Sequence, residues 1–284
     1  MSFSMKTYCG KAPFFVMAGP CVLESLEESL LIAETVKTVC RKLGLALIFK
    51  ASFDKANRTS IKGNRGPGLE KGLEMLSEIG QKTGLPLVTD VHYPEQASEA
   101  AKVCQILQIP AFLCRQTDLV LAACRASSVV NVKKGQFLSP WDTEHIVNKI
   151  REHSAAEVML TERGTTFGYG NLVVDMRSFP VMKKWADFVV FDATHSLQLP
   201  GGAGGKTGGQ REFIPHLARA AMATGSVQGI FMEVHPEPSR SPSDADNILP
   251  LNQFEAVMTS LVNIKKALVI PNRPNRDRPR NVIK

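Results

Sequence analysis

The feature that most constrains the fold is an alternation of short β-branched runs with longer amphipathic stretches along the chain. The short runs are predicted strands, with ranges Phe14–Ala18, Ala46–Ala51, Leu87–Val91, Ala111–Leu113, Val129–Val132, Val158–Leu160, Phe188–Phe191 and Ile230–Val234. The longer stretches have helical periodicity, with ranges Leu26–Leu43, Leu69–Thr83, Glu95–Leu107, Thr143–Glu152, Arg211–Ala223 and Leu251–Leu268. Ser25 is placed to cap the start of the first helix, and Gly44 its end.

About eight strand–helix units without a central linker predict an α/β protein with one domain over residues 1–270, a closed (β/α)8 TIM barrel. A doubly wound open sheet is the competing arrangement. It has fewer strands and usually a Gly-rich turn after the first, and Gly19-Pro20-Cys21 lacks that fingerprint. The segment Gly201–Thr207 resembles a phosphate loop, but Pro200 stands where the Walker pattern needs Gly, so we expect a lid there instead.

Charge and hydropathy exclude several classes of function. The net charge of +7 is concentrated in a Pro-rich tail, residues 271–284, which is typical of a solvated, poorly ordered end rather than a nucleic-acid arm. No run reaches the roughly 20 apolar residues that span a bilayer. The apolar stretch Phe14–Leu23 is a poor signal peptide because Pro20 occupies its cleavage region, and the six cysteines form no CxxC pair. We expect a cytoplasmic protein without membrane or nucleic-acid partners.

Cationic side chains follow several predicted strands. In a parallel barrel the carboxyl ends of the strands meet at one rim, where active sites are built. The cations expected to face that rim are Lys50, Lys55, Arg58, Arg115, Lys133 and Arg163. Like charges in one cleft need compensating anions, so the set predicts a ligand with several negative groups, or two anionic ligands. The alternative is a solvated rim neutralised by carboxylates such as Asp54, Asp90 and Glu162.

A second group of residues has the chemistry of metal ligands. Cys21, His195 and Glu233 follow the first, seventh and eighth strands, which are neighbours in a closed barrel. A thiolate, an imidazole and a carboxylate suit a divalent Zn, Fe, Mn or Co ion. Asp244 is the expected fourth ligand, with Asp246 as its competitor. A single His or Cys is more often structural, so spacing alone leaves both interpretations open.

At these residues the chain resembles the 3-deoxy-D-manno-octulosonate 8-phosphate (Kdo-8-phosphate) synthases, from about Phe14 to about Leu268. The resemblance lies in AGPCVLES at Ala18–Ser25, FKASFDKANRTS at Phe49–Ser60, RQTDL at Arg115–Leu119, NVKKGQF at Asn131–Phe137, FGYGNLVVDM at Phe167–Met176, FDATHSLQ at Phe191–Gln198 and EVHPEP at Glu233–Pro238. It implies a homotetrameric barrel that joins phosphoenolpyruvate to D-arabinose 5-phosphate and releases phosphate, in the synthesis of the lipopolysaccharide core.

The resemblance also implies roles for individual residues. The expected catalytic residues are Lys55, Asp90, Lys133 and His195, with Asp90 beside the reacting aldehyde. Lys55, Lys133, Gln136 and Arg163 would hold phosphoenolpyruvate, with Ser52 and Arg115 nearby. Asn57, Arg58 and Thr59 would bind arabinose 5-phosphate, and Thr59 keeps the hydroxyl of the Ser that is frequent there. Lys50, Gln116 and Phe167 complete the expected substrate site. Cys21, His195, Glu233 and Asp244 match the ligands of the metal-dependent branch, whereas the metal-independent branch has Asn at position 21.

Two alternatives remain. The 3-deoxy-D-arabino-heptulosonate 7-phosphate synthases share the barrel and metal set but take erythrose 4-phosphate. They typically show KPRT where this chain has Lys55-Ala56-Asn57-Arg58, and the Asn57 amide can bind a sugar hydroxyl. A barrel that binds sugar phosphates or metals without catalysis is the other.

Overall fold

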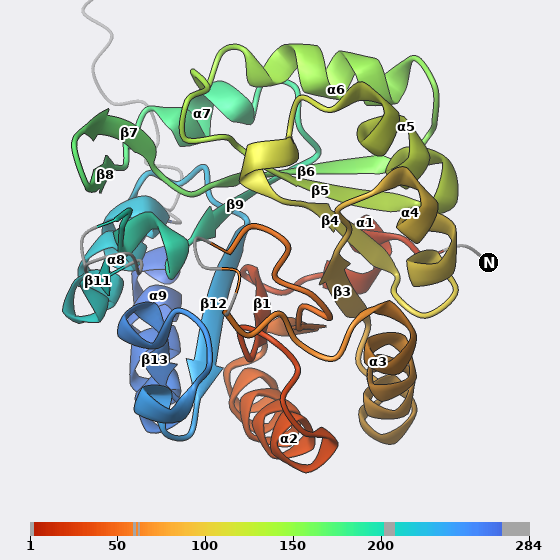
Figure 1. Cartoon of the computed structure of the whole chain (residues 1–284). Coiled ribbons are helices and arrows are strands. Elements are labelled where there is room, and N and C mark those ends of the chain that lie inside the picture. The colour runs from red at the N-terminus through yellow and green to blue at the C-terminus, as the bar shows by residue number, and fades with distance from the viewer. Residues whose placement is uncertain (1–2, 59–60, 62, 202–207, 269–284) are drawn as a thin grey trace, which may run out of the picture.

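The structure, a computed structural model, describes residues 3–58, 61, 63–201 and 208–268. Eight parallel strands pair in chain order and close into a barrel because the first pairs with the last (Figure 1). They are β1 Phe15–Gly19, β2 Ala46–Lys50, β3 Leu87–Asp90, β4 Ile106–Ile109, β5 Val129–Lys133, β6 Glu157–Glu162, β9 Phe188–Asp192 and β12 Gly229–His235. The predicted (β/α)8 barrel is confirmed.

Helices surround the barrel and cover the outer face of the strands. The main ones are α2 Leu26–Leu43, α3 Leu69–Thr83, α4 Pro94–Ala101, α5 Thr117–Ala126, α6 Thr143–Arg151, α8 Ile214–Ala223 and α9 Phe254–Leu268, with a short α7 at Ser178–Met182. The predicted caps of α2 are confirmed. The Ser25 hydroxyl accepts from the Glu28 backbone N–H at 3.1 Å, and Gly44 is left-handed with φ 67°.

The predicted fourth strand, Ala111–Leu113, is wrong. Those residues form a 3₁₀ helix, and the strand is Ile106–Ile109, whose first two residues lie in the segment Glu95–Leu107 predicted as a helix. The apolar run Ala111–Leu113 imitates a strand, whereas Gln108 interrupts the apolar pattern of the real one. Pro110 then ends the pairing because it has no N–H to donate.

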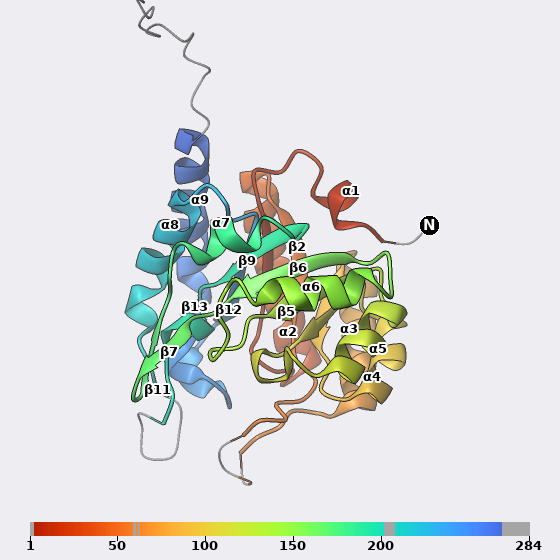
Figure 2. The same ribbon diagram turned by 90° about the horizontal axis from the view of Figure 1, so that it is seen from above.

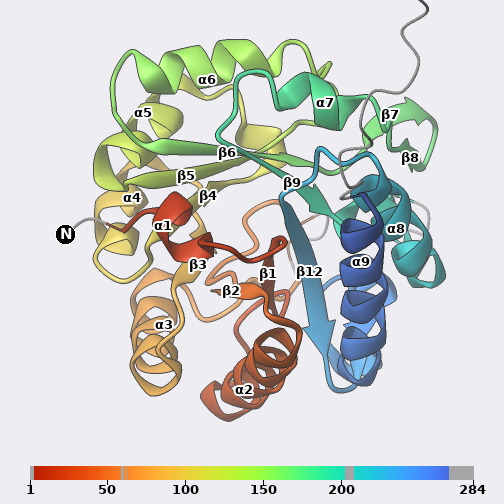
Figure 3. The ribbon, with the colours of Figure 1, turned by 180° about the vertical axis from the view of Figure 1, so that it is seen from behind.

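The two faces of the barrel strands build two separate cores. Outward residues pack against the helices. Inward residues, among them Met17, Ile48 and Phe231, fill the barrel interior together with Met5 of α1, Met5–Cys9. Figure 3 shows α1 lying across the barrel end where the strands begin, and Figure 2 places the loops after the strands at the opposite end. The site therefore has to be sought at that opposite end.

Short strands extend the loops at the mouth of the barrel. The hairpin of β7 Thr165–Gly168 and β8 Asn171–Val173 follows β6, and β10 Gln198–Leu199 pairs with β11 Gly208–Gly209. β13 Leu249–Pro250 extends the end of β12. The predicted lid at 201–207 lies, apart from residue 201, outside the described residues, as does the predicted tail at 271–284. In the described part of the chain, no helix has the length and apolarity needed to cross a membrane.

Candidate active site

A cavity of about 820 Å³ opens at the carboxyl ends of the strands. Ten of the predicted site residues line it: Lys50, Lys55, Asn57, Arg58, Asp90, Lys133, Gln136, Arg163, His195 and Asp244. Ser52, Cys21 and Glu233 are buried directly beside this lining. The Ser52 hydroxyl accepts from Lys50 Nζ at 2.9 Å, and Glu233 Oε1 lies 3.1 Å from the same nitrogen. The residues that the sequence scatters over seven strands therefore meet at one mouth.

Three predicted residues in the described part of the chain are not brought to this cavity. Arg115 and Gln116 are exposed in the turn before α5, and Phe167 on β7 is 87% exposed. The prediction that Arg115 faces the cavity is wrong for the single chain, because β4 ends at Ile109 and the 3₁₀ helix carries Arg115 past the rim. Pro110, Ala111 and Phe112 line the cavity in its place. Thr59 lies outside the described residues.

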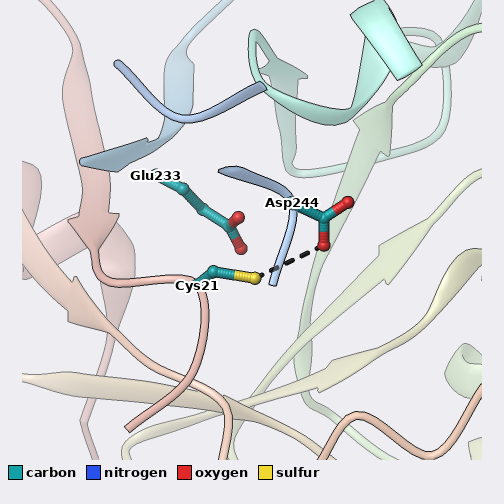
Figure 4. Close-up of side chains that lie close together, drawn as sticks. All are labelled: Cys21, Glu233 and Asp244. Carbon is teal, nitrogen blue, oxygen red and sulfur yellow. Dashed lines mark hydrogen bonds between the residues drawn. The ribbon is translucent and has the colours of Figure 1, made fainter. Parts of the chain in front are cut away.

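Three of the predicted metal ligands converge beside the cavity. The ligand atoms of Cys21, Glu233 and Asp244 all lie within 4.8 Å of one another, and Cys21 Sγ is 3.5 Å from Asp244 Oδ2 (Figure 4). Glu233 Oε2 is buried without a hydrogen-bond partner among the described residues, while Glu233 Oε1 lies 3.5 Å from His195 Nε2. A thiol, two carboxylates and an imidazole around an unsatisfied oxygen fit a first-row divalent cation. Asp246, the competitor of Asp244, is directed at Arg211.

The backbone at Asp244 is held in an uncommon conformation. Asp244 is the one residue other than Gly with a positive φ, 52°, among the described residues. Its side chain accepts from Gln198 Nε2 at 2.7 Å and from the Ser243 hydroxyl at 2.8 Å. Left-handed Asp is tolerated but costs free energy, and such positions gather at functional sites. The surrounding contacts therefore aim this carboxylate at Cys21 rather than leaving it in solvent.

Asp192, at the end of β9, orients the imidazole of His195. Asp192 Oδ2 lies 2.8 Å from His195 Nδ1 and also accepts from Lys133 Nζ at 2.8 Å. A proton on Nδ1 leaves Nε2 as the free ligand atom on the side of Glu233, which is the usual arrangement of a carboxylate behind a metal-binding His. Burial would raise the pKa of Asp192, but His195 and Lys133 outweigh it and hold the pKa far below its ordinary value.

Carboxylates of the mouth lie close to two of its lysines. Lys50 lies 3.1 Å and Lys55 3.7 Å from Glu233. Burial alone would lower the pKa of Lys55, yet Cys21 and Glu233 oppose it and the pKa is raised overall. The pKa of Glu233 is lowered to about 2 because His195 and the two lysines outweigh its burial. For Cys21, burial and Glu233 raise the pKa of the thiol, an effect that a bound divalent cation would reverse.

Arg163 differs from these lysines because no carboxylate lies in salt-bridge distance among the described residues. Its Nη2 donates to Gln198 Oε1 at 2.5 Å, while Nε and Nη1 are buried without a partner in the same part of the chain. Gln136 Oε1 is likewise buried and unpaired there. A buried guanidinium with free N–H groups at a cavity wall is ready to bind an anion.

Sequence reasoning gave no role to Gln198 or Asp192. Gln198 joins Arg163 to Asp244, and Asp192 joins Lys133 to His195. Each links a predicted anion-binding cation to a predicted metal ligand. The available signal was position: Asp192 ends β9, and Gln198 stands three residues past His195. Polar residues at strand ends are too common for such a position to single them out.

A second group of possible ligands, Glu24, Glu28 and His235, is explained without a metal. His235 Nδ1 accepts from the Glu237 backbone N–H at 3.0 Å, so the ring proton of the neutral imidazole sits on Nε2. That nitrogen lies 2.6 Å from Glu28 Oε1, a charge contact whose direction is too poor for a hydrogen bond among the described residues. A ring nitrogen carrying a proton cannot bind a cation. The group therefore ties the start of α2 to the end of β12.

Comparison with known proteins gives one consistent result. A profile of the DAHP synthetase I family matches residues 3–269. The protein named 2-dehydro-3-deoxyphosphooctonate aldolase from Trichlorobacter lovleyi is 56% identical over 246 residues, 87% of this chain and 90% of the relative. Its namesakes from Syntrophotalea carbinolica and Desulfotalea psychrophila are 54% and 53% identical, over 91% and 90% of this chain and 93% and 91% of the relatives. With this barrel and this mouth, the chain belongs to the DAHP synthetase I family, in the group of the 2-dehydro-3-deoxyphosphooctonate aldolases, which are the Kdo-8-phosphate synthases.

Proposed function

We propose that this chain condenses phosphoenolpyruvate with D-arabinose 5-phosphate and water to give Kdo-8-phosphate and inorganic phosphate. The observation that carries the proposal is the buried guanidinium of Arg163, whose Nε and Nη1 have no partner among the described residues, in a cavity that Lys133 also lines. Phosphoenolpyruvate offers both a carboxylate and a phosphate to such a pair. The names of the relatives point to the same product.

The cavity divides naturally between two substrates. Lys55, Lys133, Gln136 and Arg163 would hold phosphoenolpyruvate, while Asn57 and Arg58, in the same loop as Lys55, would hold the sugar phosphate. Asp90, at the end of β3, lines the same cavity and would sit beside the aldehyde. Lys50 Nζ lies 3.5 Å from Asp90 Oδ2, and the Ser52 hydroxyl donates to the same oxygen. Holding both reactants in contact removes much of the entropic barrier to a two-substrate reaction.

The reaction forms two bonds and breaks one at carbon 2 and carbon 3 of phosphoenolpyruvate. Carbon 3 bonds to the aldehyde carbon, whose oxygen takes a proton, and the oxygen of water bonds to carbon 2. The resulting phosphohemiketal loses phosphate by cleavage of the bond between carbon 2 and oxygen. Negative charge gathers on the departing phosphate, where Arg163 and Lys133 are already in place.

We also propose that the enzyme belongs to the metal-dependent branch, with Cys21, His195, Glu233 and Asp244 as ligands. A bound divalent cation supplies Lewis acidity and a fixed direction for an oxygen ligand. The donor set and the unsatisfied Glu233 oxygen support this, and Zn, Fe, Mn and Co all suit such ligands.

The choice of aldose phosphate rests on the loop after β2. The family profile includes enzymes that take erythrose 4-phosphate, so the family alone does not choose between the aldoses. Asn57 lines the cavity and can bind a sugar hydroxyl, which Pro at this position could not do. A non-catalytic barrel would bind the ligands without releasing phosphate.

Assembly and location complete the proposal. Phe112, Phe137 and Trp141 are each more than half exposed at the same end of the barrel as the cavity, which supports self-association into a homotetramer. All six cysteines are free, which agrees with a cytoplasmic location. Light scattering should give four times the 31.1 kDa chain mass.

The test is phosphate release from phosphoenolpyruvate with each of the two aldose phosphates. We expect turnover with arabinose 5-phosphate, loss on chelation and recovery on adding metal back. Cys21→Ser should lower the bound metal, whereas Cys40→Ser, in the core between α2 and the barrel strands, should not. Preference for erythrose 4-phosphate would refute the proposed substrate. Full activity of the metal-free protein would refute the proposed dependence on a metal.

A further inference from the structure

A row of polar side chains crosses the barrel interior directly below the mouth. Asp90, Gln108, Asn131 and Thr161 lie on the neighbouring strands β3, β4, β5 and β6 (Figure 1). Two residues earlier on each strand stands an apolar residue of the interior core: Val88, Ile106, Val129 and Met159. Because side chains alternate along a strand, the polar four also point inward. Gln108, Asn131 and Thr161 are fully buried.

These side chains form one continuous hydrogen-bond chain. The Thr161 hydroxyl donates to Asn131 Oδ1 at 2.7 Å, Asn131 Nδ2 to Gln108 Oε1 at 2.7 Å, and Gln108 Nε2 to Asp90 Oδ1 at 2.6 Å. From the other side, the Ser52 hydroxyl donates to Asp90 Oδ2 at 2.5 Å and accepts from Lys50 Nζ. Both branches therefore end on the Asp90 carboxylate.

The direction of every bond follows from the charge on Asp90. An ionised carboxylate only accepts, so Gln108 must present its NH₂ group to it. The Gln108 oxygen then faces Asn131, which presents its own NH₂, and the Asn131 oxygen receives the Thr161 hydroxyl. Hydrogen bonds aligned in this way polarise one another and strengthen the last bond of the chain.

Packing alone does not call for polar residues here. The layer immediately below is apolar on the same four strands, and burying amides in place of aliphatic groups costs free energy unless each is satisfied. The hydrogen bonds that satisfy these polar groups end on Asp90, which lines the cavity, and this gives a reason for the polar layer.

We propose that Gln108, Asn131 and Thr161 are positioning residues, which act as a directed hydrogen-bond chain to hold Asp90 oriented and ionised beside the reacting aldehyde. This inference rests on the proposed function for the identity of the aldehyde, while the hydrogen-bond chain itself is a property of the fold. Several other charged groups face Asp90 and favour its ionised form: Lys50 from β2, Lys55 from the loop after it, Lys133 from β5 and His92 from its own strand end. Burial raises the pKa of Asp90, but these groups outweigh it and hold the pKa well below its ordinary value.

The decisive variant is Gln108→Met, which keeps the length of the side chain and removes the donor to Asp90. We expect kcat with arabinose 5-phosphate to fall about tenfold, and the acid limb of the pH profile to move up by about one pH unit, the equivalent of one lost hydrogen bond to a charged group. Binding of phosphoenolpyruvate, measured by calorimetry, should be unchanged. Titration of the Asp90 carboxyl by ¹³C NMR should show the same upward movement without any turnover.

Substitutions at Thr161 test whether the far end of the hydrogen-bond chain, beyond the bond from Gln108, also affects Asp90. Thr161→Val should move the acid limb in the same direction by a smaller amount, and Thr161→Ser, which keeps the hydroxyl, should restore the original profile. The matched control is Thr89→Val on β3, since Thr89 is fully buried and its hydroxyl has no partner in the described residues.

The outcomes separate the two hypotheses. Absence of turnover in the unaltered protein refutes the proposed function. The NMR titration still tests whether the hydrogen-bond chain favours the ionised form of Asp90. An Asp90 titration unchanged in Gln108→Met refutes the inference. Identical profiles for Thr161→Val and Thr89→Val would overturn the part assigned to Asn131 and Thr161.

Discussion

Replacing Asp192 by Asn should damage the site more than its small change in shape implies. Asp192 accepts four hydrogen bonds: Oδ2 from Lys133 Nζ and His195 Nδ1, and Oδ1 from the backbone N–H groups of Thr194 and His195. An amide replaces one of these oxygens with an NH₂ group. Whichever way it turns, that NH₂ group then faces two donors.

The size of the effect follows from those four bonds. Two lost hydrogen bonds to a charged group amount to about 3–6 kcal/mol, and removing one partner of a buried ion pair costs about 3–5 kcal/mol. The two estimates agree, so we expect the free energy of unfolding to fall by about 3–5 kcal/mol and Tm by on the order of 10 °C. If the ring proton moves to Nε2 to relieve the clash, His195 loses its free ligand atom. Metal affinity should then fall about 10- to 100-fold.

The assay is metal titration and phosphate release on Asp192→Asn, with Asp187→Asn as the matched control. Asp187 precedes β9 and pairs with the exposed Lys6, away from the cavity. Asp187→Asn keeps an oxygen for the backbone N–H of Val158, which donates to Asp187 Oδ2 at 3.0 Å, and loses only the pair with the exposed Lys6, which contributes about 0–1 kcal/mol. The control should therefore keep its metal and turnover, with little change in Tm. Wild-type metal affinity in Asp192→Asn would refute the role of this carboxylate in orienting His195.

Three further predictions concern separate parts of the molecule. Arg163→Met should raise Tm while abolishing turnover, since it removes a buried cation that has no carboxylate in salt-bridge distance in the described chain; a lower Tm would contradict this. The Asp90 pKa lies below its ordinary 3.8, so its contribution to stability is complete above that pH and is lost as the pH falls below it; urea unfolding from pH 7 to pH 3 should show a flatter dependence for Asp90→Asn. Met5→Ala should cost about 2–5 kcal/mol in the free energy of unfolding without changing KM, because the fully buried Met5 fills the barrel end opposite the cavity.

Most of the barrel could be predicted because its strands are buried on both faces. Val158–Leu160 and Phe188–Phe191 were found within a residue or two at each end, since apolar runs bounded by polar loops mark such strands. The fourth strand failed for the opposite reason. Gln108 points into a polar layer of the interior, so its strand lacks the continuous apolar pattern on which the prediction depended.

The site was predictable where residues stand at strand ends and not where loops carry them. Lys50, Asp90 and Lys133 end their strands, and the barrel alone brings them together. Arg115 could not be placed because a one-turn 3₁₀ helix separates it from β4 and decides its direction. Asp192 and Gln198 were missed because they act through hydrogen bonds to other residues, and no pattern of residue types records such bonds.

The unsatisfied groups at the mouth distinguish an active site from a structural ion network. A structural network is stable when every buried donor and acceptor is paired. Here His92 Nδ1, Gln136 Oε1, Arg163 Nε and Arg163 Nη1 are buried at the cavity wall without partners among the described residues, and Glu233 Oε2 is in the same state beside it. At about 1–3 kcal/mol each, the five groups cost on the order of 10 kcal/mol, comparable with the whole stability of a typical domain. Such a cost is retained where ligands recover it on binding: anions at Arg163, and a cation at Glu233.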